Sequence, residues 1–339
     1  MWAVSGDRLS GFLATDDADS GPVRLRSGHG SGNSRIQARN SPCSRVCASP
    51  AVPVAWESFC RMYTNEMKDA VDMLSRILYE DIYIIVAYKP AGLAVQTARL
   101  GQQDMVSELK NRREKGGNSA AAGRGEPYLG LIHRLDQPVE GILAFARIRA
   151  AAASLTGQLR AQGDEGGFCK HYYAVLCGVP DCREGRLEDY LYKQALKNGK
   201  HTDYRAVIVN PDTASAESAL GEAAKARRAV LEYRILEPNK EQGLALADIR
   251  IRTGRFHQIR AQMAHAGLPL LGDLKYGSPE ARALAAACGV RNVALCAYSL
   301  GFVHPVSGEK MDFRIKPENP AFSSFHLTEK SAARPTWNQ

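Results

Sequence analysis

The sequence has no uninterrupted apolar run of ten residues, whereas a membrane-spanning helix needs about 20. Its amino terminus carries acidic residues and lacks the apolar core of a secretory signal. We therefore expect no transmembrane segment, no association with a membrane and no secretion. The composition, 45% hydrophobic and 24% charged, is typical of a soluble globular protein and excludes a fully disordered or collagen-like chain.

Nucleotide and metal signatures are also missing. The chain has neither a P-loop nor a Rossmann glycine pattern. Its eight cysteines form no Cys-x-x-Cys pair, and no His–Cys cluster has zinc-finger spacing. We expect reduced, mostly buried thiols in a cytoplasmic protein.

Acidic residues are outnumbered by basic ones. The sequence has 44 Lys and Arg against 36 Asp and Glu, a formal net charge of +8. This positive excess suits a polyanionic partner, and it favours nucleic acid over a membrane surface as that partner. Many proteins without such a partner are equally basic, so the motifs must decide.

The first 66 residues lack lysine and have few large apolar side chains; the first lysine is Lys68. So little apolar surface cannot offset the entropy of ordering the segment. We interpret residues 1–66 as a disordered leader and hypothesise that translation starts at Met67 or a nearby methionine. Residues 67–322 then form the folded domain, and residues 323–339 a flexible tail.

Regular structure is predicted from residue 77 onward. Runs of β-branched and aromatic residues predict strands over 77–88, 142–146, 172–177, 229–236 and 245–251. Helices are predicted over 149–162, over 258–265 and from a Ser-Pro-Glu start at 278–280. Residues 111–127, rich in glycine, alanine and charge, predict a mobile loop. Strands outnumber helices and do not alternate regularly with them, which indicates an α+β fold.

The most informative segment runs from Leu131 to Gly141. An apolar pair begins it, a proline and a glycine end it, and His133, Arg134 and Asp136 lie between. Functional side chains concentrate on loops held by a rigid scaffold. A surface turn with solvated charges explains the same residues, so this loop alone leaves both interpretations open.

A second segment, Asp248–Arg260, has four arginines within eleven residues. Together they form a cationic surface of the size that a phosphate needs. A solvated strand face accounts for the first two arginines, but Arg260 lies beside Ile259 on a helix expected to face the core. A buried guanidinium needs a carboxylate, and Asp136 is the natural candidate.

The third segment, Lys170–Gly178, is a predicted strand with tyrosines on both faces. Such tyrosines usually serve the core and the surface. The functional interpretation is that a tyrosine ring on this strand is a surface on which a nucleobase stacks.

Taken together and in this order, the segments resemble the RluA-type RNA pseudouridine synthases. The family's catalytic loop is matched by His133–Arg134–Leu135–Asp136, and its tyrosine motif by Lys170–His171–Tyr172. Its arginine motif is matched by Thr253–Gly254–Arg255 with His257–Gln258–Ile259–Arg260. Flanking matches agree, among them Lys89–Pro90–Ala91–Gly92, Gly272–Asp273 and Tyr276–Gly277. One tetrapeptide would be weak, but three ordered motifs with their flanks, over residues 77–318, are a specific signal.

The resemblance implies a pseudouridine synthase fold of the α+β class, with a large mixed, mostly antiparallel sheet and flanking helices and loops around a central cleft. It also implies isomerisation of uridine to pseudouridine in structured RNA, with residues 67–322 as the catalytic domain. That reaction requires no metal, redox cofactor or group donor. We expect a monomer that acts on ribosomal RNA, with transfer RNA as the second choice.

The resemblance also assigns catalytic roles. Asp136 carries the chemistry, either by adding to the sugar or base or by removing a sugar proton. Arg260 pairs with Asp136 and keeps it ionised. Tyr172 stacks on the uracil and helps to remove the proton from carbon 5.

Five further residues are implied to bind the substrate: Arg134, Ile259, His133, Arg255 and His257. Arg134 fills the place in the RNA that the everted nucleotide leaves, and Ile259 gives the base an apolar backing. Arg255 is expected to contact phosphate, together with Arg252 and Lys275.

Val139–Glu140 departs from the family's pattern, which usually has Thr-Ser before the glycine of the catalytic loop. The Glu140 carboxylate either disfavours ionisation of Asp136, as a like charge does, or faces solvent without effect.

Three other functions compete with this interpretation. A glycosidase would use Asp136 with Glu140 as its two carboxylates, but it leaves the arginine motif unexplained. A non-catalytic RNA-binding module has no need of an apolar-backed carboxylate. A metal-dependent nuclease would need His133, His257 and His265 as ligands, although histidines at such positions more often cap loops or lie satisfied in a core.

Overall fold

The computed structural model describes residues 75–97, 101–115, 128–161, 167–199, 201–209 and 226–327. The chain divides into two units, Met1–Met62 and Tyr63–Gln339, and every described residue belongs to the second. The expected leader, the proposed start at Met67 and residues 328–339 of the expected tail lie outside the described ranges.

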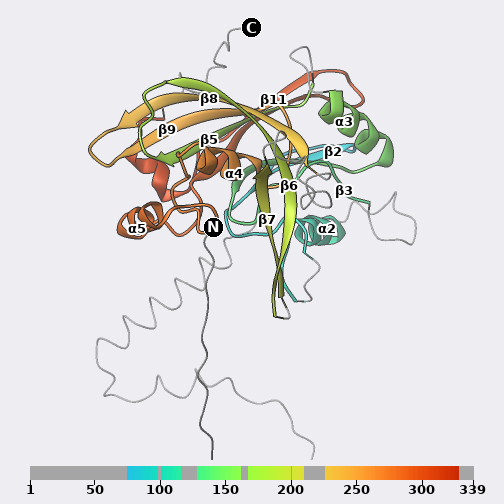
Figure 1. Cartoon of the computed structure of the whole chain (residues 1–339). Coiled ribbons are helices and arrows are strands. Elements are labelled where there is room, and N and C mark those ends of the chain that lie inside the picture. The colour runs from blue at the N-terminus through green and yellow to red at the C-terminus, as the bar shows by residue number, and fades with distance from the viewer. Residues whose placement is uncertain are drawn as a thin grey trace, which may run out of the picture. The chain divides into compact units, whose positions relative to one another are not determined.

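One eleven-stranded sheet dominates the fold (Figure 1). Along the chain its strands are β1 (Arg76–Glu80), β2 (Ile84–Lys89), β3 (Gly130–Leu131), β4 (Glu140–Ala146), β5 (Cys169–Cys177), β6 (Glu184–Asn198), β7 (His201–Val209), β8 (Arg227–Asn239), β9 (Leu244–Ile251), β10 (Leu295–Val303) and β11 (Lys310–Arg314). Their order across the sheet is β1-β2-β4-β10-β5-β9-β8-β6-β7, with β3 paired to β4 and β11 to β10. Among the described pairs only β10 and β4 run parallel, which confirms a mixed, mostly antiparallel sheet.

The helices are short and few. They are α2 (Met105–Lys115), α3 (Arg149–Ala161), α4 (Gln258–His265), α5 (Pro279–Ala287) and the 3-10 turn η5 (Pro320–Ser324). The predicted start of α5 is confirmed, because Ser278 accepts a hydrogen bond from the Ala281 N–H and Pro279 occupies the first turn. The loop predicted over 111–127 is wrong at its start: residues 111–115 are the last turn of α2, and the rest lies outside the described residues.

The strand alternation explains where the core lies. On β5, Tyr172, Ala174 and Leu176 belong to one apolar cluster, whereas Tyr173 and Val175 belong to the cluster on the other face. Both faces of this central strand are therefore buried, and its even-numbered residues point toward the side where α4 and the loop before β4 meet. The predicted tyrosines on both faces are confirmed.

The β6–β7 hairpin was not predicted. Its residues alternate between exposed and partly exposed along much of their length, so no apolar period reveals the strands. Figure 1 shows the hairpin running past the neighbouring strands, and α4 packs against both of its strands. The hairpin therefore forms one wall beside α4.

The packed region extends beyond the expected domain end at residue 322. Phe325 is buried with Phe322 in the cluster on the β5 face that carries Tyr173. Phe325 therefore belongs to the packed domain and not to the expected flexible tail.

Candidate active site

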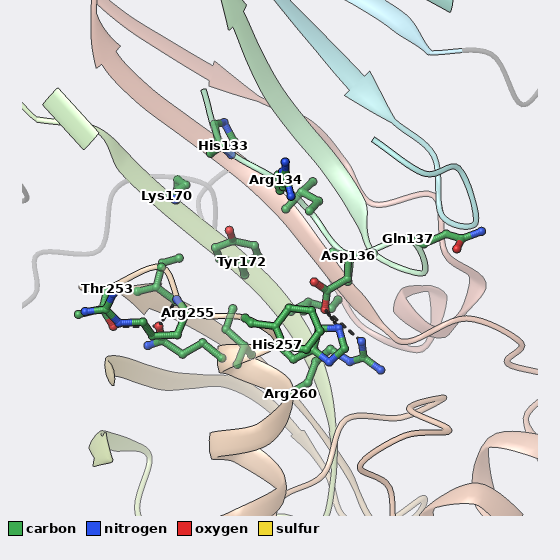
Figure 2. Close-up of a pocket in the computed structure, with 18 of the residues that line it drawn as sticks. His133, Arg134, Asp136, Gln137, Lys170, Tyr172, Thr253, Arg255, His257 and Arg260 are labelled. Carbon is green, nitrogen blue, oxygen red and sulfur yellow. Dashed lines mark hydrogen bonds and ion pairs between the residues drawn. The ribbon is translucent and has the colours of Figure 1, made fainter. Parts of the chain in front are cut away.

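A cleft of about 1020 Å³ opens over the even-numbered face of β5 (Figure 2). All eight residues expected to act in catalysis or substrate binding line it: His133, Arg134, Asp136, Tyr172, Arg255, His257, Ile259 and Arg260. They come from the loop between β3 and β4, from β5, from the turn after β9 and from α4. Segments far apart in the sequence thus meet in one cavity.

Asp136 and Arg260 are in direct contact. The Arg260 Nη1 donates to Asp136 Oδ2 at 3.0 Å, so the ion pair predicted between these residues is present. The Asp136 side chain remains 24% exposed, whereas that of Arg260 is 6% exposed. The buried Arg260 guanidinium therefore holds the Asp136 carboxylate, which remains accessible from the cleft.

Arg260 has a second carboxylate partner that the sequence interpretation did not assign. Its Nε and Nη2 donate to Asp273 Oδ2 and Oδ1 at 2.7 and 2.8 Å. Burial opposes the charge on Arg260, but the bonds to Asp273 and then Asp136 outweigh it and raise the Arg260 pKa. In the sequence, the sign of Asp273 is its place in the Gly272–Asp273 match, which implies no role for it.

His257 also approaches Asp136, with its Nε2 3.6 Å from Asp136 Oδ2. Its Nδ1 lies 2.9 Å from the Tyr276 hydroxyl, and that oxygen accepts the Ala206 N–H at 2.7 Å. The hydroxyl proton is therefore free for Nδ1, which leaves the imidazole proton on Nε2, toward Asp136. Burial lowers the His257 pKa to about 4, against the opposing effect of Asp136, so the ring is neutral at pH 7.

The backbone at His257 is unusual. With φ +50° it is the one non-glycine residue of the described chain in the left-handed region, and it precedes α4 as the N-cap. The Phe256 ring stacks on the imidazole with centroids 3.7 Å apart. His257 thus lies outside the helical backbone of α4, with its imidazole stacked on one side and directed at Asp136.

A hydrogen-bonded turn fixes the arginine motif. The Gln258 Oε1 accepts from Thr253 Oγ1 at 2.8 Å and from the Arg255 N–H at 3.0 Å. Its amide donates to the Val230 carbonyl, and the Val230 N–H donates to Thr253 Oγ1. The turn is thereby tied to β8, and α4 starts in the register that carries Ile259 and Arg260 into the cleft.

Lys89 anchors the loop that carries Asp136. The side chain is fully buried, and its ammonium donates to the carbonyls of Pro90, Leu93 and Gln137 at 2.8–3.0 Å. The Gly92 N–H also donates to the Gln137 carbonyl, at 2.8 Å. Burial lowers the Lys89 pKa to about 7, while Asp136 and Glu140 oppose the shift. Lys89 belongs to a flanking match that carried no assigned role.

Tyr172 and Ile259, each 5% exposed, are two of the apolar residues that line the cleft. Figure 2 shows the Tyr172 ring between Lys170 and Asp136. Burial, with the charge of Asp136, raises the Tyr172 pKa, so its hydroxyl stays protonated at pH 7.

The remaining expected substrate contacts differ in their surroundings. Arg134 and Arg255 are both exposed, and the Arg255 Nε donates a hydrogen bond to the Arg228 carbonyl. His133 is buried, and its Nε2 accepts the Ala144 N–H at 3.4 Å. Lys275 lines the cleft, but its ammonium is 2.7 Å from Asp203 Oδ1.

Arg252 pairs with Glu232 on the neighbouring strand and is not among the cleft-lining residues. The expected phosphate contact at Arg252 is therefore not supported.

Glu140 neither faces solvent nor lines the cleft. It is 2% exposed and accepts the Tyr88 hydroxyl at 2.9 Å and the N–H groups of Glu318 and Asn319 at 3.1 Å each. Val139, one residue earlier, lines the cleft, so the strand alternation directs Glu140 away from it. A glycosidase pair of Asp136 and Glu140 is wrong on this geometry.

The nuclease alternative also fails. His265 is exposed and does not line the cleft with His133 and His257. Within the described residues, no group of three or more His, Cys, Asp or Glu side chains is placed to hold a metal ion.

Comparison with known proteins fits this geometry. The sequence profile of the family described as RNA pseudouridylate synthase matches residues 83–265, more than half of the chain. The chain belongs to this family. The match includes the Asp136 loop, β5 and α4, and it makes the protein an RNA pseudouridine synthase, an isomerase.

The relatives include ribosomal large subunit pseudouridine synthase D of Zymomonas mobilis, 29% identical over 71% of this chain and 69% of the relative. Ribosomal large subunit pseudouridine synthase C of Buchnera aphidicola is 29% identical over 77% and 73%. The solved structure of human RNA pseudouridylate synthase domain containing 4 has the same fold, with a TM-score of 0.53 at 22% identity over 72% of this chain and 89% of that one.

No helix in the described ranges is long and apolar enough to cross a membrane.

Proposed function

We propose that this pseudouridine synthase modifies uridine in ribosomal RNA of the large subunit, with Asp136 as the group that performs the chemistry. The observation that carries the proposal is the Asp136 carboxylate, open to the cleft and 3.0 Å from a guanidinium whose other nitrogens are bound to Asp273. Two of the relatives described above are named for the large ribosomal subunit, which supports this RNA before transfer RNA.

The reaction exchanges one bond to the sugar for another. The bond between C1′ and uracil N1 breaks, the base turns within the cleft, and C1′ bonds to C5. The C5 proton leaves and N1 gains one, so no electrons, group donor or metal are needed. Asp136 either adds covalently to the sugar or base or removes a sugar proton to give a glycal. Both routes need the ionised carboxylate.

Arg260 supplies the charge that keeps Asp136 ionised and oriented. Because Asp273 occupies Nε and Nη2, the guanidinium cannot rotate away, and Nη1 remains directed at Asp136. His257 adds a neutral N–H toward the same oxygen. Asp136 Oδ2 is thus held, and Oδ1 is left for the substrate.

Tyr172 and Ile259 receive the base. The target nucleotide must leave its stack, at a cost of a few kcal/mol, and stacking on Tyr172 returns roughly 1–3 kcal/mol. Ile259 excludes water on the apolar side. Arg134, an exposed cleft-lining residue two positions before Asp136, fills the position that the everted nucleotide leaves.

RNA, a polyanion, suits the positive charge of the cleft. Six cationic residues line it besides Arg260: Arg134, Arg160, Lys170, Lys193, Arg255 and Lys275. Among the lining residues the one carboxylate is Asp136. A structured RNA loop offers both the unstacked base and the phosphates that such a surface attracts. The proposal includes a monomer acting in the cytoplasm.

The test is to map pseudouridine across all cellular RNA with and without the gene, and then to incubate the purified protein with the unmodified RNA found. We expect at least one large-subunit uridine to lose its modification in the deleted strain and to regain it in the reconstituted reaction. Loss confined to transfer RNA would overturn the substrate assignment. Binding of RNA without any new pseudouridine would favour the non-catalytic module.

A further inference from the structure

Lys170 projects into the cleft two residues before Tyr172, from the same face of β5. Figure 2 shows it beyond the Tyr172 ring as seen from Asp136. The residue is only 9% exposed, yet it lines the cavity. It is thus a buried cation at the opposite end from the Asp136–Arg260 pair.

Three other basic residues of the cleft are already engaged. Lys275 binds Asp203, Lys193 lies 3.7 Å from the centroid of the Tyr204 ring, and Arg255 donates to the Arg228 carbonyl. Lys170 differs, since within the described part of the chain no carboxylate, carbonyl or hydroxyl accepts a hydrogen bond from its ammonium.

Its neighbour His133 is not an acceptor either. The His133 Nε2 already accepts the Ala144 N–H, so the proton lies on Nδ1, and that buried N–H has no partner. Burial, and then the charge of Lys170, lower the His133 pKa, which keeps the ring neutral. With exposed Arg134 next in the chain, this end of the cleft offers hydrogen-bond donors and positive charge.

A buried charge without a partner costs stability, and folded proteins rarely keep one. Burial lowers the Lys170 pKa to about 8, so the group is still mostly charged at pH 7. A neutral uracil carbonyl would leave that charge uncompensated, whereas a phosphodiester supplies one negative charge and several acceptor oxygens.

We propose that the Lys170 ammonium binds a backbone phosphate of the RNA beside the everted nucleotide. This inference rests on the proposed function, because it takes RNA as the ligand. It assigns Lys170 to substrate binding, separate from the chemistry at Asp136.

The experiment compares wild type with Lys170→Met, which keeps the length and apolar stem of the side chain. Affinity for an in vitro transcript of bacterial large-subunit ribosomal RNA is measured over a range of salt concentrations. We expect about tenfold weaker binding at physiological salt, the size of one charge-assisted hydrogen bond. The slope of log K against log salt should fall by about 0.7–0.9, because one fewer counterion is released.

A second readout separates binding from folding. Removal of an unpartnered buried charge should raise the Tm of the free protein by about 2–4 °C. Lys310→Met is the matched control, an exposed lysine on β11 outside the cleft, and should change neither the salt slope nor Tm.

Each alternative outcome overturns the proposal in a recognisable way. Weaker binding with an unchanged salt slope would mean that Lys170 contacts a neutral group such as a base carbonyl. A lower Tm for the variant would mean a partner within the chain. Stabilisation of wild type by inorganic phosphate that is lost in Lys170→Met, without a change in RNA binding, would mean a site for a free anion. Because binding is measured without turnover, the absence of pseudouridine formation would count against the proposed function and leave this test intact.

Discussion

Asp273 accepts two parallel hydrogen bonds from Arg260, from Nε at 2.7 Å and from Nη2 at 2.8 Å, and both side chains are buried. Two parallel bonds fix the plane of a guanidinium as well as its position. The third nitrogen is thereby aimed at Asp136. The position of the Asp136 carboxylate in the cleft thus depends on Asp273, which does not itself line the cleft.

Arg260→Ala should harm both folding and activity. The substitution leaves Asp273 buried without its partner, and such a loss costs about 3–5 kcal/mol of unfolding free energy. Chemical denaturation and pseudouridine formation are the measurements. Arg314→Ala is the control, because it removes a partly exposed pair with Asp312 worth less than about 1 kcal/mol. A variant at Arg260 with wild-type stability would show that the pair is not buried.

Tyr172→Phe separates stacking from proton transfer. The ring keeps its apolar surface, so RNA affinity should stay within about threefold, whereas kcat should fall by about 10²–10⁴ if the hydroxyl moves a proton. Single-turnover rates with saturating enzyme report this step. An unchanged rate would reduce Tyr172 to a stacking platform.

His257 makes stability depend on pH in acid. Its pKa is about 4 in the folded protein and 6.5 in the unfolded chain. The unfolded state therefore binds more protons between these values, so this contribution is complete above pH 6.5 and is lost as the pH falls toward 4.

Unfolding free energies of wild type and His257→Asn, measured from pH 7.5 to 4, test this. Asparagine tolerates the left-handed backbone at this position, so the fold should persist. The variant should lose less stability over the window than wild type. Identical pH profiles would mean that His257 titrates normally in the fold.

Glu140→Gln should weaken the fold but not the chemistry. The carboxylate accepts hydrogen bonds from Tyr88, Glu318 and Asn319, and an amide opposes at least one of these donors with its own NH₂ group. We expect a loss of about 1–3 kcal/mol in unfolding free energy and an unchanged kcat for the folded enzyme. The reverse result, lower kcat at full stability, would show that Glu140 acts on Asp136.

Several parts of this structure could be predicted from sequence because the signals are local. Alternation and β-branched residues located β4, β5, β8 and β9, and the capping pattern located α5. The order of the three motifs located the cleft and the contact between Asp136 and Arg260.

Other parts depend on three-dimensional contacts without a local signal. Strand β6 buries few of its residues, so its pattern resembles a solvated loop. Asp273 meets Arg260 only because the chain folds back after α4. The lack of a partner at Lys170 is likewise a property of the assembled cleft, since the sequence places histidine, cysteine and tyrosine beside it as candidate partners.

The most direct test of the account is Asp136→Asn on the unmodified target RNA, with pseudouridine measured by nucleoside chromatography and mass spectrometry and RNA binding measured in parallel. The amide has nearly the same shape but cannot act as nucleophile or base. The account predicts no pseudouridine above background and RNA affinity within about threefold of wild type. Pseudouridine formation by Asp136→Asn at a rate close to that of wild type would contradict it.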